Sequence, residues 1–170
     1  MEILFEWDER TRLMKLRKIT EDDTDNIIKW RNSEDVLKYF LDKRPLTAER
    51  HNEWYQNMIL TGKVHQFIIV LDDEREIGSV YLKNIDTVNS NAEFGIFIGE
   101  KCEKGKGYGT MATRLICDYA FRTLHLHKVY LRLLSDNQRA EKCYEKAGFD
   151  REGVFVDNIW DGDKFINVTF

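Results

Sequence analysis

The fold is decided by one stretch, residues 91–124, with the sequence NAEFGIFIGEKCEKGKGYGTMATRLICDYAFRTL. Its first part predicts a strand, the middle a glycine-rich loop, and a helix begins near Tyr108. Gly105, Gly107 and Gly109 stand at alternate positions in the loop. Because glycine has no Cβ, the backbone N–H groups of such a loop can turn toward a ligand. Together with the positive end of the helix dipole, they predict an anion site suited to a pyrophosphate.

Two common phosphate-binding loops are excluded by single positions. A P-loop requires Gly-Lys followed by Ser or Thr, whereas Gly105-Lys106 is followed by Gly107. A dinucleotide fingerprint counted from Gly105 ends at Thr110 instead of a glycine. These mismatches disfavour a nucleotide-binding oxidoreductase.

The loop does match the pattern Q/R-x-x-G-x-G/A, with Lys104 in the first place. In this it resembles the coenzyme A pyrophosphate signature of the GNAT superfamily of N-acetyltransferases, with Lys replacing Gln or Arg. Downstream, KVYLRLLS, Asn137 and a helix ending in Tyr144-x-x-x-Gly-Phe resemble the closing segment of that superfamily. Upstream, Glu93 stands early in its strand, as in the GNAT enzymes related to ribosomal-protein N-terminal acetyltransferases. The resemblance covers residues 13–170.

Length and composition indicate one domain, residues 1–170, with 42% hydrophobic and 33% charged residues. The net charge of −4 argues against a nucleic-acid partner. No apolar run is long enough to span a bilayer, and MEILFEWDER lacks the basic start of a signal peptide. Three scattered cysteines favour reduced thiols over disulfides or a metal site. We therefore expect a cytoplasmic protein without a metal or a membrane partner.

The remaining periodicities predict an α+β chain. The expected strands and helices are a strand at 13–19 that could pair with 2–7, helices at 20–32, 33–40 and 47–59, strands at 66–71, 77–85 and 128–135, a helix ending at Gly148, and a hairpin turning at Asp161-Gly162. The resemblance implies the GNAT fold, a central and mostly antiparallel mixed sheet flanked by helices. In that fold the fourth and fifth strands splay apart, and the acyl-CoA enters the gap.

Acetyl transfer to an amine needs a proton acceptor, a polarised carbonyl and a proton donor for the leaving thiolate. An alkyl amine with a pKa near ~10 is mostly protonated at neutral pH, so a base or a water chain has to take a proton. By resemblance, Glu93 is the candidate base, acting through water, and Tyr144 the candidate acid. Each also has a plainer interpretation, as an ion-paired carboxylate for Glu93 and as a tyrosine packed on the sheet for Tyr144.

The resemblance implies acetyl-CoA as the cosubstrate, held by the strand before the loop, the loop itself and the start of the following helix. The expected residues are Ile96, Phe97, Ile98, Lys104, Gly105, Lys106, Gly107, Tyr108, Gly109, Thr110 and Asn137. Backbone N–H groups around Phe97 and Ile98 would polarise the thioester. Asn137 has a helix N-cap as its competing interpretation. Arg139 and Lys142 are further candidates for the 3′-phosphate.

The acceptor is expected to be a small-molecule amine bound by the early helices, the loop after them and the third strand. The candidates are Trp30, Arg31, Asn32, Tyr39, His51, Trp54, Tyr55 and Tyr81. The segments WRNSEDVLKYF, ERHNEW and AEFGIF together resemble N-acetyltransferases that act on nucleotide-linked 4-amino sugars. Spermidine acetyltransferases are also similar over the CoA half, but residues 30–60 contain no dense acidic cluster for a polyamine.

Other functions stay open. Protein N-termini are a further class of acceptor, and some proteins of this fold bind CoA without catalysis. The presence of both Glu93 and Tyr144 favours an enzyme. The long strands of the C-terminal hairpin could also pair between two subunits, as a homodimer.

Overall fold

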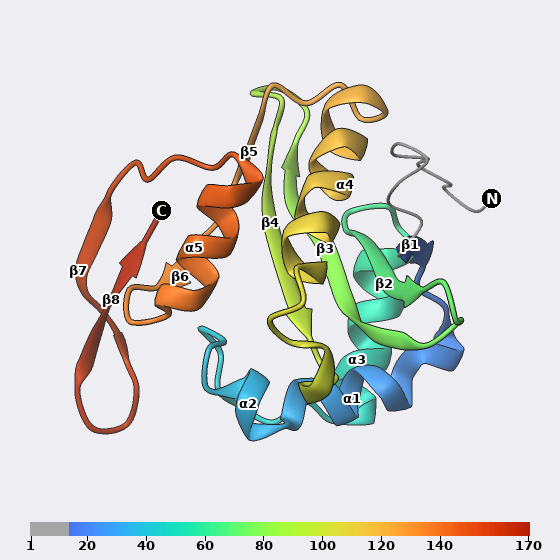
Figure 1. The fold of residues 1–170 in the computed structure, drawn as a ribbon, viewed down its shortest axis with the longest axis horizontal. Helices are drawn as coiled ribbons and strands as arrows, with labels where there is room; N and C mark the ends of the chain where they lie inside the picture. Colours follow the sequence, from blue (N-terminus) through green and yellow to red (C-terminus); the bar gives the residue numbers. More distant parts are fainter. Residues whose placement is uncertain (1–13) are drawn as a thin grey trace.

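Five strands form the central sheet of the computed structural model, which describes residues 14–170 (Figure 1). They are β1 (Met14–Lys18), β2 (His65–Leu71), β3 (Glu76–Asp86), β4 (Asn91–Ile98) and β5 (Lys128–Tyr130), in that order across the sheet. The first four are antiparallel to their neighbours, and β5 is parallel to β4. This confirms the expected mixed and mostly antiparallel sheet. The predicted strand 2–7 lies outside the described residues.

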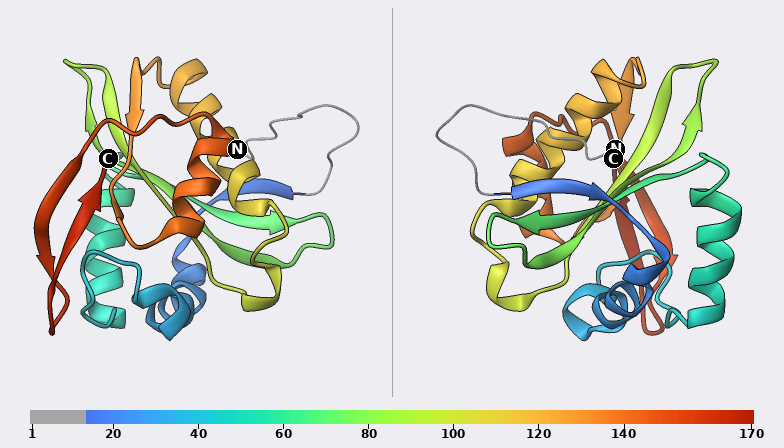
Figure 2. Two further views of the ribbon diagram at one scale, coloured as in Figure 1. Left: turned by 60° about the vertical axis from the view of Figure 1, so that its left-hand side comes forward. Right: turned by 90° about the vertical axis from the view of Figure 1, so that its right-hand side faces the viewer.

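Helices cover both faces of the sheet (Figure 2). On one face α4 (Tyr108–Arg122) packs on β2, β3 and β4 through residues that include Ile116, Phe67 and Val80. On the other face lie α1 (Thr24–Asn32), α2 (Glu34–Leu37) and α3 (Ala48–Trp54), the last continuing as a π-helical turn, Tyr55–Ile59. The helix α5 (Gln138–Ala147) lies beside α4. None of the helices within residues 14–170 is long and apolar enough to cross a membrane.

Caps are present at the predicted starts of the first and the third of the early helices. Asp23 ends a short 3₁₀ turn, Glu21–Asp23, and its carboxylate accepts a hydrogen bond from the Thr20 N–H at 2.7 Å. The Thr47 hydroxyl accepts one from the Arg50 N–H at 3.3 Å and caps α3. Each cap satisfies an N–H group that the first helical turn would otherwise leave without a partner.

The prediction of one strand at 128–135 is wrong, because the chain changes sheets there. After β5, the short strand β6 (Leu133–Leu134) joins a second sheet. The other strands of that sheet are β8 (Phe165–Thr169) and β7 (Val154–Trp160), and the order is β6-β8-β7. The pairing of β4 with β5 covers only Asn91–Glu93. Beyond Glu93, β4 therefore pairs with β3 alone, and the expected divergence of the fourth and fifth strands is present.

Candidate active site

The start of α4 presents backbone donors that have no partner among the described residues. Gly107 has φ = 92° and is the N-cap of the helix. Its carbonyl accepts the first hydrogen bond of the helix, from the Met111 N–H at 3.1 Å. Within residues 14–170, the N–H groups of Tyr108, Gly109 and Thr110 donate no hydrogen bond to the protein. Free donors at a helix N-terminus, next to glycines without a Cβ, fit the pyrophosphate of a CoA molecule.

A buried carboxylate, Glu103, holds the glycine loop against the sheet. It ends a 3₁₀ turn (Lys101–Glu103) and is only 3% exposed. Its oxygens accept hydrogen bonds from Arg75 at 2.7 Å and Lys106 at 2.9 Å. These bonds, first of all the one from Arg75, lower the pKa of Glu103 to about 2. No motif in the sequence marks Glu103 or Arg75, since both belong to ordinary polar runs.

Helix α5 closes the other side of the loop. A Cβ on Gly109 would lie 3.3 Å from the Cys143 sulfur, and one on Gly105 would lie 3.5 Å from a terminal nitrogen of Arg139. The guanidinium of Arg139 therefore lies beside the loop, where it could meet a phosphate. Asn137 has the N-cap role that competed with ligand binding, because its side-chain oxygen accepts the Ala140 N–H at 3.2 Å.

Tyr144 extends from α5 toward the unpaired part of β4. Its ring meets Phe94 edge to face, with the centroids 5.7 Å apart. Burial is the main cause that raises the pKa of its hydroxyl well above the ordinary value, and Tyr81 is close enough to add to the shift. A phenol in this state keeps its proton at neutral pH and can donate it.

Glu93 is a buried carboxylate whose oxygens are already engaged. It is 4% exposed and accepts hydrogen bonds from Arg132 Nη2 at 3.0 Å and from the Asn84 amide at 2.8 Å. The ammonium group of Lys83 lies 3.5 Å away. Glu93 thus forms the ion pairs that its plainer interpretation predicts. A proton could reach this carboxylate only through a water or a neighbouring hydroxyl that competes with these donors.

Tyr81 joins the two halves of the site. It lies opposite Gly95 in the β3–β4 ladder, and its ring occupies the space that a Cβ at Gly95 would need. Burial raises the pKa of Tyr81 to about 12, with Arg31 opposing the shift and Glu93 adding to it. Tyr81 is therefore close to an acceptor candidate, Arg31, and to both catalytic candidates.

The other acceptor candidates have partners within the protein or lie at its surface. Trp30 is 2% exposed and donates its indole N–H to Glu100 at 2.7 Å. Asn32 clamps the loop through the N–H and C=O of Leu46, both at 2.8 Å. Trp54 donates a hydrogen bond to Gln66, and His51 is hydrogen-bonded to Thr24. Tyr55 is buried, and Tyr39 is exposed. Trp30 and Tyr55 belong to one buried cluster against which Tyr81 packs, and Arg31 opposes the rise in the pKa of Tyr81.

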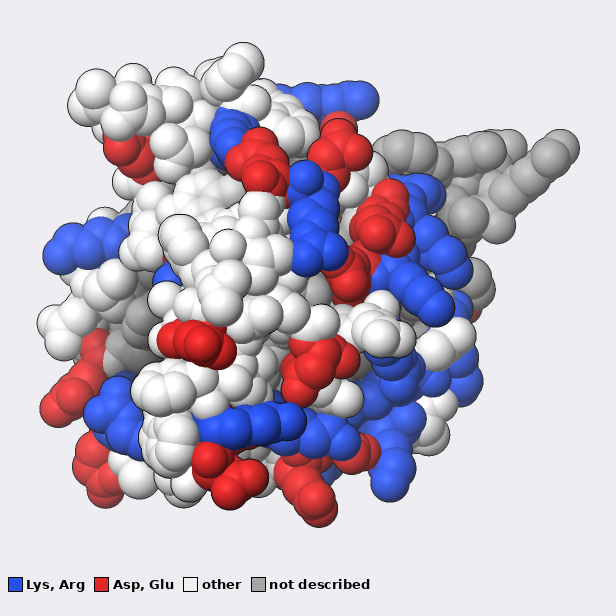
Figure 3. Space-filling view, turned by 90° about the vertical axis from the view of Figure 1, so that its left-hand side faces the viewer, with Lys and Arg blue, Asp and Glu red and all other residues white. Residues whose placement is uncertain are grey.

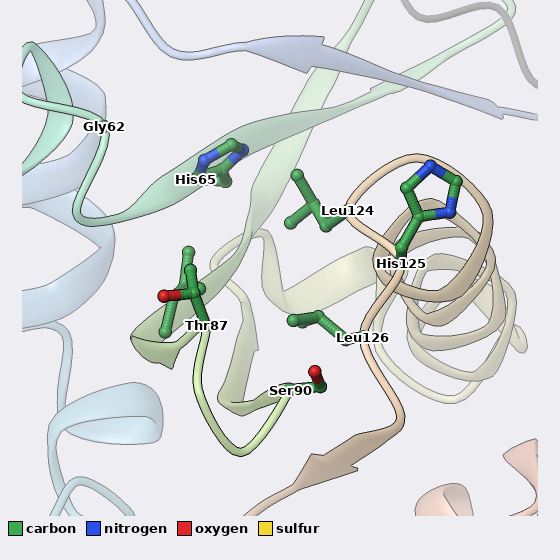
Figure 4. Close-up of a pocket in the computed structure, with 8 residues that line it drawn as sticks. Gly62, His65, Thr87, Ser90, Leu124, His125 and Leu126 are labelled. Atoms are coloured by element: carbon green, nitrogen blue, oxygen red, sulfur yellow. The ribbon is translucent and has the colours of Figure 1, made fainter.

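A separate hollow of about 430 Å³ lies at the opposite end of the sheet (Figure 4). Its lining includes His65, Thr87, Ser90 and His125. The Nδ1 of His65 lies 2.6 Å from the Tyr119 hydroxyl, so this ring is already engaged in the protein. None of the predicted site residues lines this hollow.

Comparisons with known proteins agree with this geometry. The family model described as Acetyltransferase (GNAT) domain matches residues 13–150. The spermidine N(1)-acetyltransferase of Escherichia coli K12 is 29% identical over 154 residues, 91% of this chain and 82% of that protein. Acetyltransferase PseH of Campylobacter jejuni is 28% identical over 160 residues, 89% of each chain.

Among solved structures, one is the spermidine N-acetyltransferase from Vibrio cholerae in complex with CoA and spermine. It matches with a TM-score of 0.87 and 26% identity, over 94% of both chains. The family model spans most of the chain and includes the glycine loop and the diverging strand β4. The chain therefore belongs to the GNAT family and is an N-acetyltransferase.

Proposed function

We propose that this chain transfers the acetyl group of acetyl-CoA directly to the primary amine of a small acceptor. The proposal rests mainly on two features of the sheet and α4 that occur together. The strands β4 and β5 separate after Glu93, and the free N–H groups of α4 stand on the same side of the sheet as α5. The gap gives a thioester access to the centre of the sheet, and the donors hold a pyrophosphate at its edge.

Three groups of the chain serve the reaction in this proposal. Acetyl-CoA supplies the acetyl group as a thioester. Backbone N–H groups of β4 around Phe97 and Ile98 polarise the carbonyl. Tyr144 donates its proton to the leaving sulfur, and Glu93 receives the amine proton through a water. Arg132 and Asn84 already bind Glu93, so in this proposal they fix the orientation of the carboxylate that the water approaches.

Two acceptor classes are supported by different observations. The relatives that are named for spermidine support a polyamine more than an amino sugar. The side chain of Arg31, whose buried Nη1 has no hydrogen-bond partner among residues 14–170, supports an acceptor with an anionic part, such as a nucleotide-linked amino sugar. Both classes offer a primary amine to the same thioester.

The test is acceptor-dependent release of the CoA thiol by the wild-type protein and by Glu93→Gln. The panel contains spermidine, a UDP-linked 4-amino-4,6-dideoxy sugar and a peptide with a free N-terminus. We expect turnover with one class and a loss of about 10²-fold in Glu93→Gln, the range for a general base. Equal turnover by Glu93→Gln would assign Glu93 a structural role only. Absence of CoA binding in calorimetry would contradict the proposal as a whole.

A further inference from the structure

Lys83 places a primary amine of the chain itself beside the candidate general base. Its ammonium group lies 3.5 Å from a Glu93 oxygen, and the two residues stand opposite each other in the β3–β4 ladder. Asn84 and Arg132 bind the same carboxylate more closely, at 2.8 and 3.0 Å. Lys83 is therefore the most loosely held of these three donors. Its side chain is 28% exposed, so its amine is not sealed inside the protein.

Other lysines near the candidate site are bound more tightly and to carboxylates without a proposed part in the reaction. Lys106 of the glycine loop donates a hydrogen bond to Glu103 at 2.9 Å. Lys29 of α1 donates one to Glu100 at 3.0 Å. Among residues 14–170, Lys83 is the lysine whose ammonium pairs with the candidate base.

The amine of Lys83 also lies at the edge of the gap between β4 and β5. Its nitrogen is 5.9 Å from the centroid of the Tyr81 ring. The Tyr81 hydroxyl lies 2.5 Å from the place that a Cβ on Gly95 would take. Gly95 belongs to the part of β4 that has separated from β5, two residues beyond Glu93. Since the four-carbon stem of lysine is flexible, rotation of this side chain carries the amine toward the proposed thioester position on β4.

Glu93 can take a proton from Lys83 without an intervening water. An ammonium group has to lose a proton before its nitrogen can attack a carbonyl. At 3.5 Å, the Glu93 oxygen and the Lys83 nitrogen need only a small approach to reach hydrogen-bond distance. Lys83 therefore offers what the proposed reaction requires of an acceptor, namely a primary amine beside the base and next to the gap.

We propose that Lys83 is a self-acetylation site, which takes one acetyl group from the bound acetyl thioester when no acceptor amine is present. The Lys83 nitrogen forms an amide bond with the carbonyl carbon, and the bond between that carbon and the sulfur breaks. The ammonium loses two protons. One leaves through Glu93 to solvent, and the other replaces the proton that Tyr144 gives to the sulfur. The products are acetyl-lysine, the CoA thiol and one proton.

This modification stops after one event and lowers later turnover. It rests on the proposed acetyl transfer, since it uses the same thioester, base and acid. Acetylation removes the charge of Lys83 and lengthens its side chain, so the ion pair with Glu93 is lost and space on the acceptor face is filled. Because each protein molecule consumes a single acetyl group, self-acetylation does not sustain thiol release.

The test is site-resolved mass spectrometry of the wild-type protein after incubation with acetyl-CoA and no acceptor. Lys29, whose side chain is 66% exposed, reports the background of uncatalysed acetylation. The variants are Lys83→Arg, which keeps the positive charge but cannot be acetylated in this way, and Tyr144→Phe, which removes the proton donor. Acetic anhydride needs no binding site, so it measures the ordinary reactivity of each amine.

We expect acetyl-CoA, but not acetic anhydride, to acetylate Lys83 at least ~10-fold faster than Lys29, because only the bound thioester is held next to one amine. Tyr144→Phe should slow the reaction at Lys83 by ~10²-fold, the range for a general acid, and leave Lys29 unchanged. The rate constant should not depend on protein concentration. Acetylation of Lys83 at the background rate, an equal preference with acetic anhydride, or a rate constant proportional to protein concentration overturns the proposal.

Parallel assays separate self-acetylation from the proposed function. Turnover of spermidine, the amino sugar or the peptide while Lys83 stays at background overturns self-acetylation and leaves the proposed function intact. Acetylation of Lys83 without turnover of any acceptor supports self-acetylation. After incubation with acetyl-CoA alone, the wild-type protein should lose acceptor turnover in proportion to the acetylated fraction, whereas Lys83→Arg keeps its own. Equal loss in both proteins overturns the inhibitory effect.

Discussion

Arg132 and Glu93 form the tightest charged contact at the point where β4 and β5 separate. The guanidinium donates from both Nε and Nη2 to the carboxylate, at 3.1 and 3.0 Å. Glu93 is buried, so the loss of Arg132 would leave the Glu93 carboxylate away from water with fewer hydrogen-bond donors, which is destabilising. Arg132 lies two residues after the end of β5, so this pair is formed where the chain leaves the first sheet.

We expect Arg132→Gln to lower the free energy of unfolding by ~1–3 kcal/mol, the cost of an unmet hydrogen bond to a charged group. Denaturant unfolding followed by circular dichroism measures the change. The double variant Glu93→Gln/Arg132→Gln should lose less than the sum of the single variants, because the buried charge is then absent. Strict additivity of the two single variants would argue against the contact as described.

Tyr144→Phe tests the proton donor. We expect kcat to fall by ~10²-fold with little change in the KM for acetyl-CoA, since the hydroxyl acts on the leaving group and not on binding. Steady-state kinetics with a saturating acceptor give both constants. The control is Tyr119→Phe, which removes a buried hydroxyl that contacts His65 in the separate hollow. A similar loss of kcat in both variants would point to general destabilisation.

At this scale the sequence identified motif residues but not their neighbours. Glu93, Tyr144 and the loop glycines could be named because their spacing matches a known pattern. Arg132 and Asn84 could not, because a charged or polar residue in an alternating strand normally faces solvent. Asn84 has φ = 50°, a conformation that asparagine tolerates but that no local pattern announces.

The glycine loop and α4 act as one element, and the conformation of Gly107 is its most demanding point. At φ = 92° an added Cβ strains the backbone, although no heavy atom of the protein lies within 4 Å of it. Gly62 has φ = 72° and the same open surroundings, but ends the π-helical turn on the other face. The two positions therefore carry similar strain at different places.

We expect Gly107→Ala and Gly62→Ala each to cost ~1–2 kcal/mol of stability, the price of a left-handed residue with a Cβ. Only Gly107→Ala should also weaken CoA binding, by about tenfold or more, because the new Cβ enters the cradle of N–H groups. Thermal unfolding and calorimetric titration with CoA separate the two effects. Equal CoA affinity in both variants would contradict the assigned role of the loop.

The ion pairs of Glu103, which anchor the glycine loop, should make the stability of the protein sensitive to acid. The pKa of Glu103 is about 2 in the folded protein, below its ordinary 4.5, because Arg75 and Lys106 bind the carboxylate. A carboxyl whose pKa is lower in the folded protein than in the unfolded chain stabilises the fold at pH values above the unfolded-chain pKa. This stability is lost as the pH falls toward the pKa of the folded protein. We therefore expect acid unfolding of the wild-type protein to include a contribution between about pH 4.5 and 2 that is absent in Glu103→Gln. Superimposable acid-unfolding curves would contradict it.

The segment 128–135 shows that an alternating apolar pattern does not by itself identify one continuous strand. Val129, Leu131 and Leu133 alternate as in one strand, and the sequence predicted one. In the structure Leu133 and Leu134 are both buried, and Leu134 packs with Ile166 and Val168 of the second sheet. Alternation shows which side chains are buried, but it does not show which strand lies beside them.

At the scale of the whole molecule, the C-terminal hairpin exposes a group of large apolar side chains. Phe155, Val156, Trp160 and Phe165 are all more than half exposed, and among residues 14–170 β7 pairs only with β8. Figure 3, which looks onto this side, shows broad uncharged surface between scattered acidic and basic side chains. A free strand edge beside exposed aromatic side chains is suited to pairing with a second copy.

We expect the protein to form at least a dimer, measured as molar mass by light scattering. Val156→Lys should shift it toward the monomer, because a charge opposes burial of this face. Val88→Lys is the control, since Val88 is 90% exposed in the turn between β3 and β4. A monomeric wild-type protein at micromolar concentration would contradict this prediction.

The fold as a whole was more predictable than the acceptor. Turn residues, caps and the glycine loop are local, so their order in the chain specified the sheet and its helices. The acceptor side depends on contacts between segments far apart in sequence, such as the Tyr81 ring over Gly95. Several aromatic residues placed there by analogy are held by other groups, as Trp30 is by Glu100.

The most direct test of the central claim is acetyl-CoA thiol release by the wild-type protein with and without an amine acceptor. We predict release that requires the amine, yields its N-acetyl product and is lost when the amine is already acetylated. Release at the same rate without any amine, or CoA binding with no transfer to polyamine, amino sugar or peptide, would contradict it.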